Sequence, residues 1–183
     1  MTRWYEEIQP GDKLELGKHT FSEEEIIEYN LEYDNQYFHT DPELAKHSHF
    51  GGIIASGWHT ALIGQRKLVD ALFAEEARLR ANGKEPGLSG PSPGINKMSF
   101  VTPVKPGDTI SFELSVTDKR TSKSLPGWGL LFNNVKAVNQ RGELVYSADY
   151  VGLSKLRDFT PTIKQKIGIW MGKNPALRKL LRR

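Results

Sequence analysis

The sequence predicts an α+β fold in which a curled antiparallel sheet wraps around one long helix. Three observations support this prediction. Residues 53–72 carry apolar side chains over a wide helical surface, so this helix must be covered on most sides. From residue 95 onward, apolar and polar residues alternate as they do in half-buried strands. Short turns join these later strands, which makes neighbouring strands antiparallel.

The segment before the long helix predicts one strand and two short helices. Residues 13–19 follow a Pro-Gly-Asp turn and form a short strand. Ser22 and Glu25 have the spacing of a capping box, which predicts a helix that ends near Asp34. Pro42 stands at the first position of another short helix, where its missing N–H leaves no bond unmade.

The segment after the long helix predicts the rest of the sheet. Residues 82–94 are rich in Gly and Pro and predict a loop. Four strands are then expected at residues 96–102, 109–117, 128–139 and 144–156. A sheet of this kind around a single helix is the hot-dog arrangement, in which both layers share one core. Its open edges favour dimerisation.

Composition excludes several classes of protein. The 183 residues are 38% hydrophobic and 26% charged, which is ordinary for a globular domain. The chain contains no cysteine, so a disulfide, a thiolate nucleophile and a cysteine metal site are excluded. The first residues lack the apolar run of a signal peptide, and no stretch approaches the length of a membrane span. We expect a cytoplasmic protein.

The positive charge of the chain is concentrated near its C-terminal end. The net charge is +3, yet residues 160–183 alone carry seven Lys and Arg side chains and no acid. The remainder is mildly acidic, which does not fit a nucleic-acid-binding domain. We expect a hot-dog domain at 1–158 and a basic helical extension at 159–183. The extension is expected to pack on a partner subunit, with contact to anionic lipid or to an acidic carrier protein as alternatives.

The strongest functional signal lies between residues 33 and 64. Asp34 and His39 are five positions apart in a polar, aromatic segment, and a glycine-rich stretch then leads to a helix that opens at Ser56 and Gly57. An acid and an imidazole beside a helix N-terminus are suited to moving a proton next to a polarised carbonyl. A structural interpretation also fits, in which Asp34 ends a helix, His39 is a surface residue and Gly57 eases helix packing.

The stretch Asp34-Asn35-Gln36-Tyr37-Phe38-His39 resembles the hydratase motif of the MaoC-like dehydratases, a family that includes the (R)-specific enoyl-CoA hydratases. That motif has the form D-x-N-P-x-H. The acid and the histidine match, Gln36 conservatively replaces the amide residue, and Tyr37 replaces the proline. The segments F-G-G-I-I-A-S-G-W-H-T, P-V-K-P-G-D-T-I and N-Q-R-G-E are similar to the same family. The resemblance covers residues 5–157.

The resemblance implies a hot-dog fold, a homodimer or higher homo-oligomer, and a thioester substrate on CoA or acyl carrier protein. It implies reversible hydration of a trans-2-enoyl thioester to a 3-hydroxyacyl thioester, and it implies no cofactor. Asp34 is the candidate to deprotonate the water, while His39 either holds that water or delivers a proton to C2. The N–H of Gly57, at the start of the helix, is the candidate oxyanion donor.

Four further residues are candidates for substrate contact: Gln36, Ser56, Trp58 and His59. Gln36 is expected to orient the water or the carboxylate. Trp58 and His59 are expected either to reach the acyl channel or to pack in the core. The basic segment 120–124 suits CoA phosphates, although such turns are more often only solvated.

Two other interpretations are open. Four histidines between residues 39 and 59 invite a metal site, but their spacing does not suit one and none is expected. A hot-dog thioesterase is the alternative enzyme, in which Asp34 would activate water against the carbonyl. A catalytically silent module that binds acyl thioesters is the alternative without chemistry.

Overall fold

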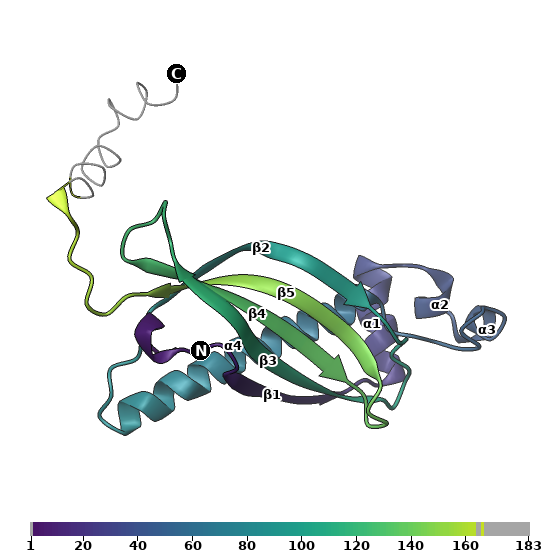
Figure 1. The fold of residues 1–183 in the computed structure, drawn as a ribbon. Helices are drawn as coiled ribbons and strands as arrows, with labels where there is room; N and C mark the ends of the chain where they lie inside the picture. Colours follow the sequence, from purple (N-terminus) through teal and green to yellow (C-terminus); the bar gives the residue numbers. More distant parts are fainter. Residues whose placement is uncertain (1, 164–165, 167–183) are drawn as a thin grey trace, which may run out of the picture.

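The computed structural model describes residues 2–163 and 166. One antiparallel sheet with the strand order β1-β3-β4-β5-β2 carries a long helix on its face (Figure 1), which confirms the α+β hot-dog prediction. The elements in chain order are a 3-10 helix Tyr5–Glu7, β1 Lys13–Thr20, α1 Glu23–Tyr33, α2 Tyr37–Thr40, α3 Pro42–Ala45, α4 Gly57–Ala81, β2 Ser89–Phe100, β3 Thr109–Thr121, β4 Trp128–Val138 and β5 Leu144–Lys155.

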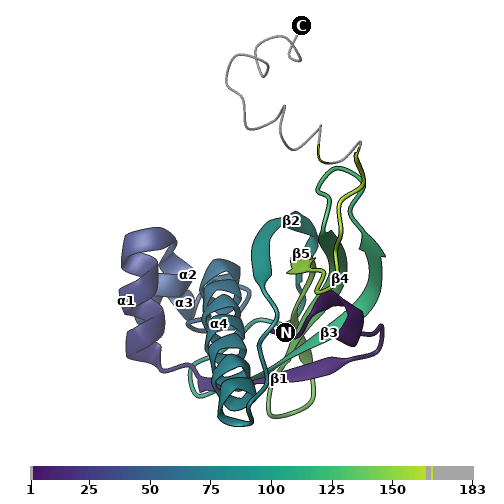
Figure 2. The same ribbon diagram turned by 90° about the vertical axis from the view of Figure 1, so that its left-hand side faces the viewer.

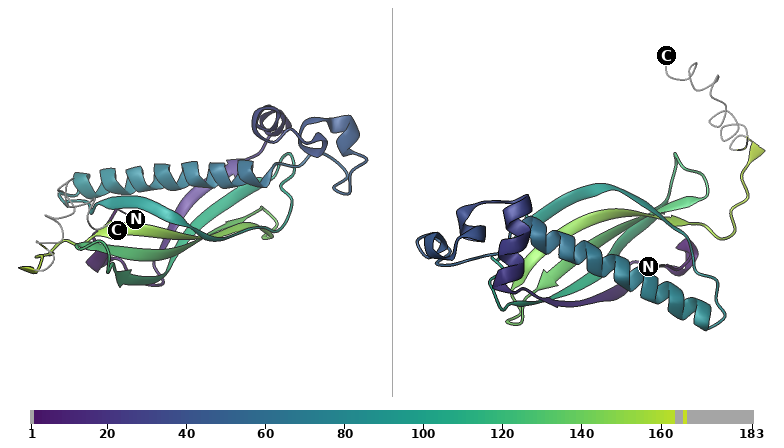
Figure 3. Two further views of the ribbon diagram at one scale, coloured as in Figure 1. Left: turned by 90° about the horizontal axis from the view of Figure 1, so that it is seen from above. Right: turned by 180° about the vertical axis from the view of Figure 1, so that it is seen from behind.

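The sheet curls around α4, which runs along one of its faces (Figures 2 and 3). Alternate residues of β3 are buried against the helix, as the two-residue period of a strand requires: Ile110, Phe112, Leu114 and Val116. A Cβ on Gly64 would lie 3.0 Å from the Phe112 ring, so glycine allows α4 to approach the sheet closely here. The short helices α1, α2 and α3 gather at one end of the sheet.

The structure corrects the expected loop at residues 82–94. β2 begins at Ser89, so the second half of that segment belongs to a strand. Within the described chain β2 pairs only with β5, and its register shifts between Gly90 and Gly94. Prolines are tolerated in edge strands and at such irregularities, because the N–H that they lack would not have bonded to a neighbouring strand there. The composition of the segment therefore misled the prediction.

Helix α4 is longer than the apolar pattern indicates. It starts at Gly57 and continues to Ala81, beyond the apolar run that ends near residue 72. The extra turns are polar, and ion pairs one turn apart, such as Glu76 with Arg80 at 2.8 Å, lie on their surface. Such pairs stabilise a helix modestly without burying it, so hydrophobic periodicity does not detect this part of α4.

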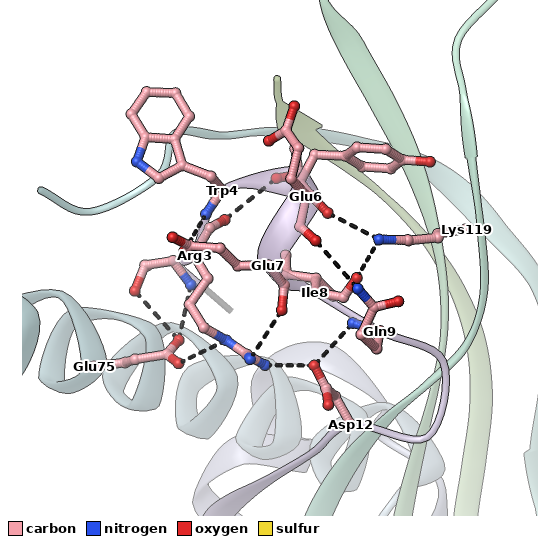
Figure 4. A network of polar contacts seen from close by, with 12 residues as sticks. Arg3, Trp4, Glu6, Glu7, Ile8, Gln9, Asp12, Glu75 and Lys119 are labelled. Carbon is pink, nitrogen blue, oxygen red and sulfur yellow. Dashed lines mark hydrogen bonds and ion pairs between the residues drawn. The ribbon is translucent and has the colours of Figure 1, made fainter. Parts of the chain in front are cut away.

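The N-terminal segment fastens the far end of α4 to the sheet (Figure 4). The N–H of Thr2 donates to the Glu75 carboxylate of α4 at 2.8 Å. From β3, the Lys119 ammonium donates to the backbone carbonyls of Tyr5 and Ile8. Hydrogen bonds to a charged group are among the stronger ones in proteins. This network holds the end of the fold that lies opposite the short helices.

Two expectations remain, one on the basic C-terminal extension and one on membrane-spanning helices. Most of the basic extension at 159–183, including its expected helix, lies outside the described residues. Among the described residues, no helix is both long and apolar enough to cross a membrane.

Candidate functional site

Asp34 stands where α1 ends. The helix begins as predicted, since the Ser22 hydroxyl accepts a hydrogen bond from the N–H of Glu25 at 3.1 Å. At its other end the Asp34 carboxylate accepts two side-chain hydrogen bonds. Gln36 donates to Oδ1 at 2.8 Å and Ser56 donates to Oδ2 at 2.6 Å. The structure thus brings three of the predicted site residues into direct contact.

His39 lies beside this carboxylate and is buried. Its Nδ1 lies 2.7 Å from the carbonyl oxygen of Ile54. A carbonyl oxygen can only accept, so Nδ1 carries the hydrogen and Nε2 of the neutral ring is left as an acceptor. That Nε2 lies 3.6 Å from Oδ2 of Asp34. The backbone contact to Ile54, fifteen positions away, has no signature in the sequence.

The environment of Asp34 keeps it ionised. Burial alone raises the pKa of this carboxyl, but the hydrogen bonds from Ser56 and Gln36 and the adjacent His39 outweigh burial and leave the pKa lowered. Near neutral pH Asp34 is therefore a carboxylate, and in the neutral form of His39 the lone pair of Nε2 faces it. Both groups accept hydrogen bonds across this gap, so together they are suited to hold one donor molecule between them.

Ser56 is the N-cap of α4. Its Oγ accepts a hydrogen bond from the N–H of Trp58 at 3.2 Å while its hydroxyl hydrogen goes to Asp34. No residue of the described chain accepts a hydrogen bond from the N–H of Gly57, as expected at the first turn of a helix. A donor at this place is favourable for a developing negative charge, since the helix dipole is positive there.

Gly57 also packs closely against the sheet. A Cβ at this position would lie 2.5 Å from atoms of the Phe100 ring, so any larger residue would displace the ring. Phe100 was not identified from the sequence, because an aromatic residue at a strand end usually only fills a core. An apolar pocket of 260 Å³ opens beside these two residues, with Phe50, Ile54 and Val145 on other walls.

Trp58 and His59 are placed differently from each other. The Trp58 ring is 57% exposed and meets the edge of Phe100, with centroids 6.2 Å apart. His59 is buried and stacks on Tyr29 at 4.1 Å, while its Nε2 lies 3.4 Å from the Glu25 carboxylate. Burial lowers the pKa of His59 despite that carboxylate. The structure does not bring His59 to Asp34.

Two other features considered in the sequence were the basic segment 120–124 and the group of histidines. The segment 120–124 belongs to the β3–β4 hairpin, at the opposite end of the sheet from α1, α2 and α3 (Figure 1). In residues 2–163 and 166, His, Cys, Asp and Glu side chains form no group of three or more that could hold a metal ion.

Comparison with known proteins places this site in a family. A family model described as a MaoC like domain matches residues 7–126, and this stretch contains Asp34, His39 and Gly57. The chain belongs to the MaoC-like family. The match ends within the β3–β4 hairpin, so β4 and β5 follow it in the same sheet.

Relatives support the assignment over most of the fold. Protein MaoC of Klebsiella aerogenes is 32% identical over 118 residues, 64% of this chain but 31% of that protein, so the chain spans about a third of this relative's length. A MaoC-like dehydratase from Rhodospirillum rubrum is 30% identical, with a TM-score of 0.69 over 85% of this chain and 99% of that one. A monoamine oxidase regulatory protein from Archaeoglobus fulgius is also 30% identical, with a TM-score of 0.70 over 88% and 99%.

Ser56→Ala tests the electrostatics of the site. It removes a donor to Asp34 and the cap of α4, so we expect the pKa of Asp34 to rise and the free energy of unfolding at pH 7 to fall by about 1 kcal/mol. A carboxyl group whose pKa is lowered by folding stabilises the folded state at pH values above its unfolded pKa of about 3.9. This contribution is lost as the pH falls through the folded-state pKa. The loss should therefore be larger at pH 7 than at pH 3.

Carboxyl NMR titration and urea unfolding would measure both effects. Ser48→Ala is the matched control, because it also removes local hydrogen bonds of a serine, to Ala45 and Phe50. It should leave the Asp34 titration unchanged. An unaltered Asp34 pKa in Ser56→Ala would contradict the assigned role of Ser56.

Proposed function

We propose that this protein interconverts trans-2-enoyl and 3-hydroxyacyl thioesters by adding or removing water. The observation that carries the proposal is the Asp34–His39 pair, in which two hydrogen-bond acceptors face each other at 3.6 Å beside a helix N-terminus. The family assignment and the related dehydratase from Rhodospirillum rubrum support it. We propose a thioester of CoA or of an acyl carrier protein as substrate, since the two share the pantetheine arm.

The pair is suited to hold the reacting water. A water molecule donates two hydrogen bonds, one to Asp34 Oδ2 and one to His39 Nε2, which leaves its lone pairs free for C3 of the substrate. As the C3–O bond forms, His39 takes a proton from the water and the ionised Asp34 stabilises the imidazolium. C2 then receives a proton from the pair, so water is added across the double bond without a net change in charge. General acid–base help of this kind contributes about 10²–10⁴-fold.

The thioester oxygen is proposed to accept from the N–H of Gly57. Attack at C3 moves negative charge onto that oxygen, and a free N–H at a helix N-terminus stabilises it. Glycine is needed at this position because the Phe100 ring fills the space that a side chain would occupy. Gln36 and Ser56 orient the carboxylate, and Trp58 forms part of the entrance. For His59 we propose a supporting role between α1 and α4 in place of substrate contact.

The geometry favours addition to C3 over hydrolysis of the thioester. A thioesterase needs one activated water directed at the carbonyl carbon, for which a single base is sufficient. Here two groups hold the water, and the imidazole that takes its proton can pass a proton on to C2, as addition to a double bond requires. A silent binding module would not need a carboxylate that two donors hold 3.6 Å from a buried imidazole.

A panel of trans-2-enoyl-CoA thioesters of different length and branching tests the proposal. We expect enoyl absorbance to be lost without release of free thiol, and Asp34→Asn and His39→Ala to lower kcat by about 10²–10⁴-fold. Asp41→Asn is the matched control, because Asp41 caps α3 and asparagine is an equally good cap. Thiol release would indicate a thioesterase, and full activity in Asp34→Asn would exclude the proposed role of the pair.

We also propose that the chain forms a homodimer. Apolar side chains follow one side of α4 in solvent, with Leu62 52% and Phe73 66% exposed, and the neighbouring edge of β2 has no partner in the described chain. Covering both at once suits a second copy better than water does. Light scattering should give about twice the chain mass of 20.7 kDa, and Leu62→Glu should shift the mass toward one chain. A wild-type mass of one chain would refute the dimer.

A further inference from the structure

A second hollow, of 540 Å³, adjoins the apolar pocket beside Gly57. The two hollows share Phe50, Thr102 and Pro103 as lining residues, so they lie side by side. The second hollow is lined by charged side chains, which the first hollow lacks. Its other walls are formed by His49, Lys105, Arg141 and Glu143. We call this hollow the Lys105 groove.

The charges around the Lys105 groove leave one cation unpaired. Arg141 is held by two carboxylates, with Nη1 2.8 Å from Asp108 and Nε 2.8 Å from Glu143. The single charge of Arg141 is thus shared between these two acids, and Glu143 also accepts a hydrogen bond from Asn139 at 2.7 Å. Lys105 forms no ion pair with any residue that the structure describes, and its side chain is exposed. Its ammonium is therefore available to an anionic ligand.

The backbone of Lys105 is fixed in place although its side chain is free. The buried Asp108 carboxylate accepts from the N–H of Lys105 at 3.0 Å, and the N–H of Asp108 donates to the Lys105 carbonyl at 3.0 Å. The same carboxylate binds Arg141 on β4's side of the hairpin turn. One buried acid thus fixes the backbone of Lys105 and the guanidinium of Arg141 at the groove.

The order of atoms in the substrate determines which part of it can reach the groove. In the proposed reaction C3 lies at Asp34 and His39, and the carbonyl oxygen lies at Gly57. The apolar pocket has Gly57 on its wall but is lined by neither Asp34 nor His39. The part of the substrate that enters it is therefore the part beyond the carbonyl, which is the sulfur and the pantetheine arm. The phosphate at the end of that arm would then reach the adjoining groove.

We propose that the Lys105 groove binds the phosphate of a phosphopantetheine arm, the group that CoA and acyl carrier protein have in common. This inference rests on the proposed function, because that function sets the direction of the substrate. It assigns phosphate recognition to Lys105, beside the reacting groups of the same chain, and not to residues 120–124 in the distant β3–β4 hairpin. Lys105 supplies the charge, and the remaining N–H groups of Arg141 add donors.

Lys105→Ala tests the groove, with one enoyl group presented on pantetheine, phosphopantetheine and CoA. We expect KM to rise about tenfold for the two phosphorylated thioesters, with kcat unchanged, and KM for the pantetheine thioester to stay the same. Lys105→Arg should restore most of the loss. Lys136→Ala removes an exposed lysine of β4 that does not line the groove and should behave as wild type.

The outcomes separate the two proposals. Equal effects on all three thioesters, or none on any, would overturn phosphate binding by Lys105 while hydratase activity stands. An effect on CoA alone would also overturn it, because the contact would then lie with the adenosine end. If no thioester is hydrated, calorimetric binding of CoA and phosphopantetheine still tests the groove, and weaker binding by Lys105→Ala that disappears at high salt would support it independently.

Discussion

The hydroxyl of Ser56 is the contact on which the site depends. It donates to Asp34 at 2.6 Å and its oxygen accepts from the N–H of Trp58 at 3.2 Å. One buried side chain therefore starts α4 and also holds the carboxylate at the end of α1. The hydrogen bond from Ser56 helps to lower the pKa of Asp34 and so favours its ionised form. The position of the carboxylate relative to the helix N-terminus follows from this single link.

The sheet completes the geometry that this link begins. It supplies Phe100 against Gly57, so the start of α4 is pressed into contact with the end of β2. The N-terminal segment holds the other end of α4 through Glu75 and Lys119. A helix fixed at both ends gives its first N–H a constant position, which is the requirement for stabilising charge only as it develops. The candidate side chains Asp34 and His39 lie at the end of α1 and in α2, next to this fixed helix.

Local signals in the sequence predicted much of this, and contacts between distant segments account for the rest. The Ser22 cap and the alternation along β3 are local, so the helix start and the core face were predicted correctly. β2 was predicted to start too late, because its pairing with β5 compensates for a composition that is typical of loops. The family resemblance predicted Asp34 and His39 as the candidate pair. The tautomer of His39, however, depends on the carbonyl of Ile54 and was outside what a pattern can predict.

The most direct test of the account follows the oxygen atom of water. The purified protein would be incubated with a trans-2-enoyl-CoA in water enriched in oxygen-18, and the products examined by mass spectrometry. The account predicts one labelled oxygen in the hydroxyl group at C3 of an intact thioester, and no label with Asp34→Asn. Label in a free carboxylate released with thiol would contradict it, because the water would then have attacked the carbonyl and not the double bond.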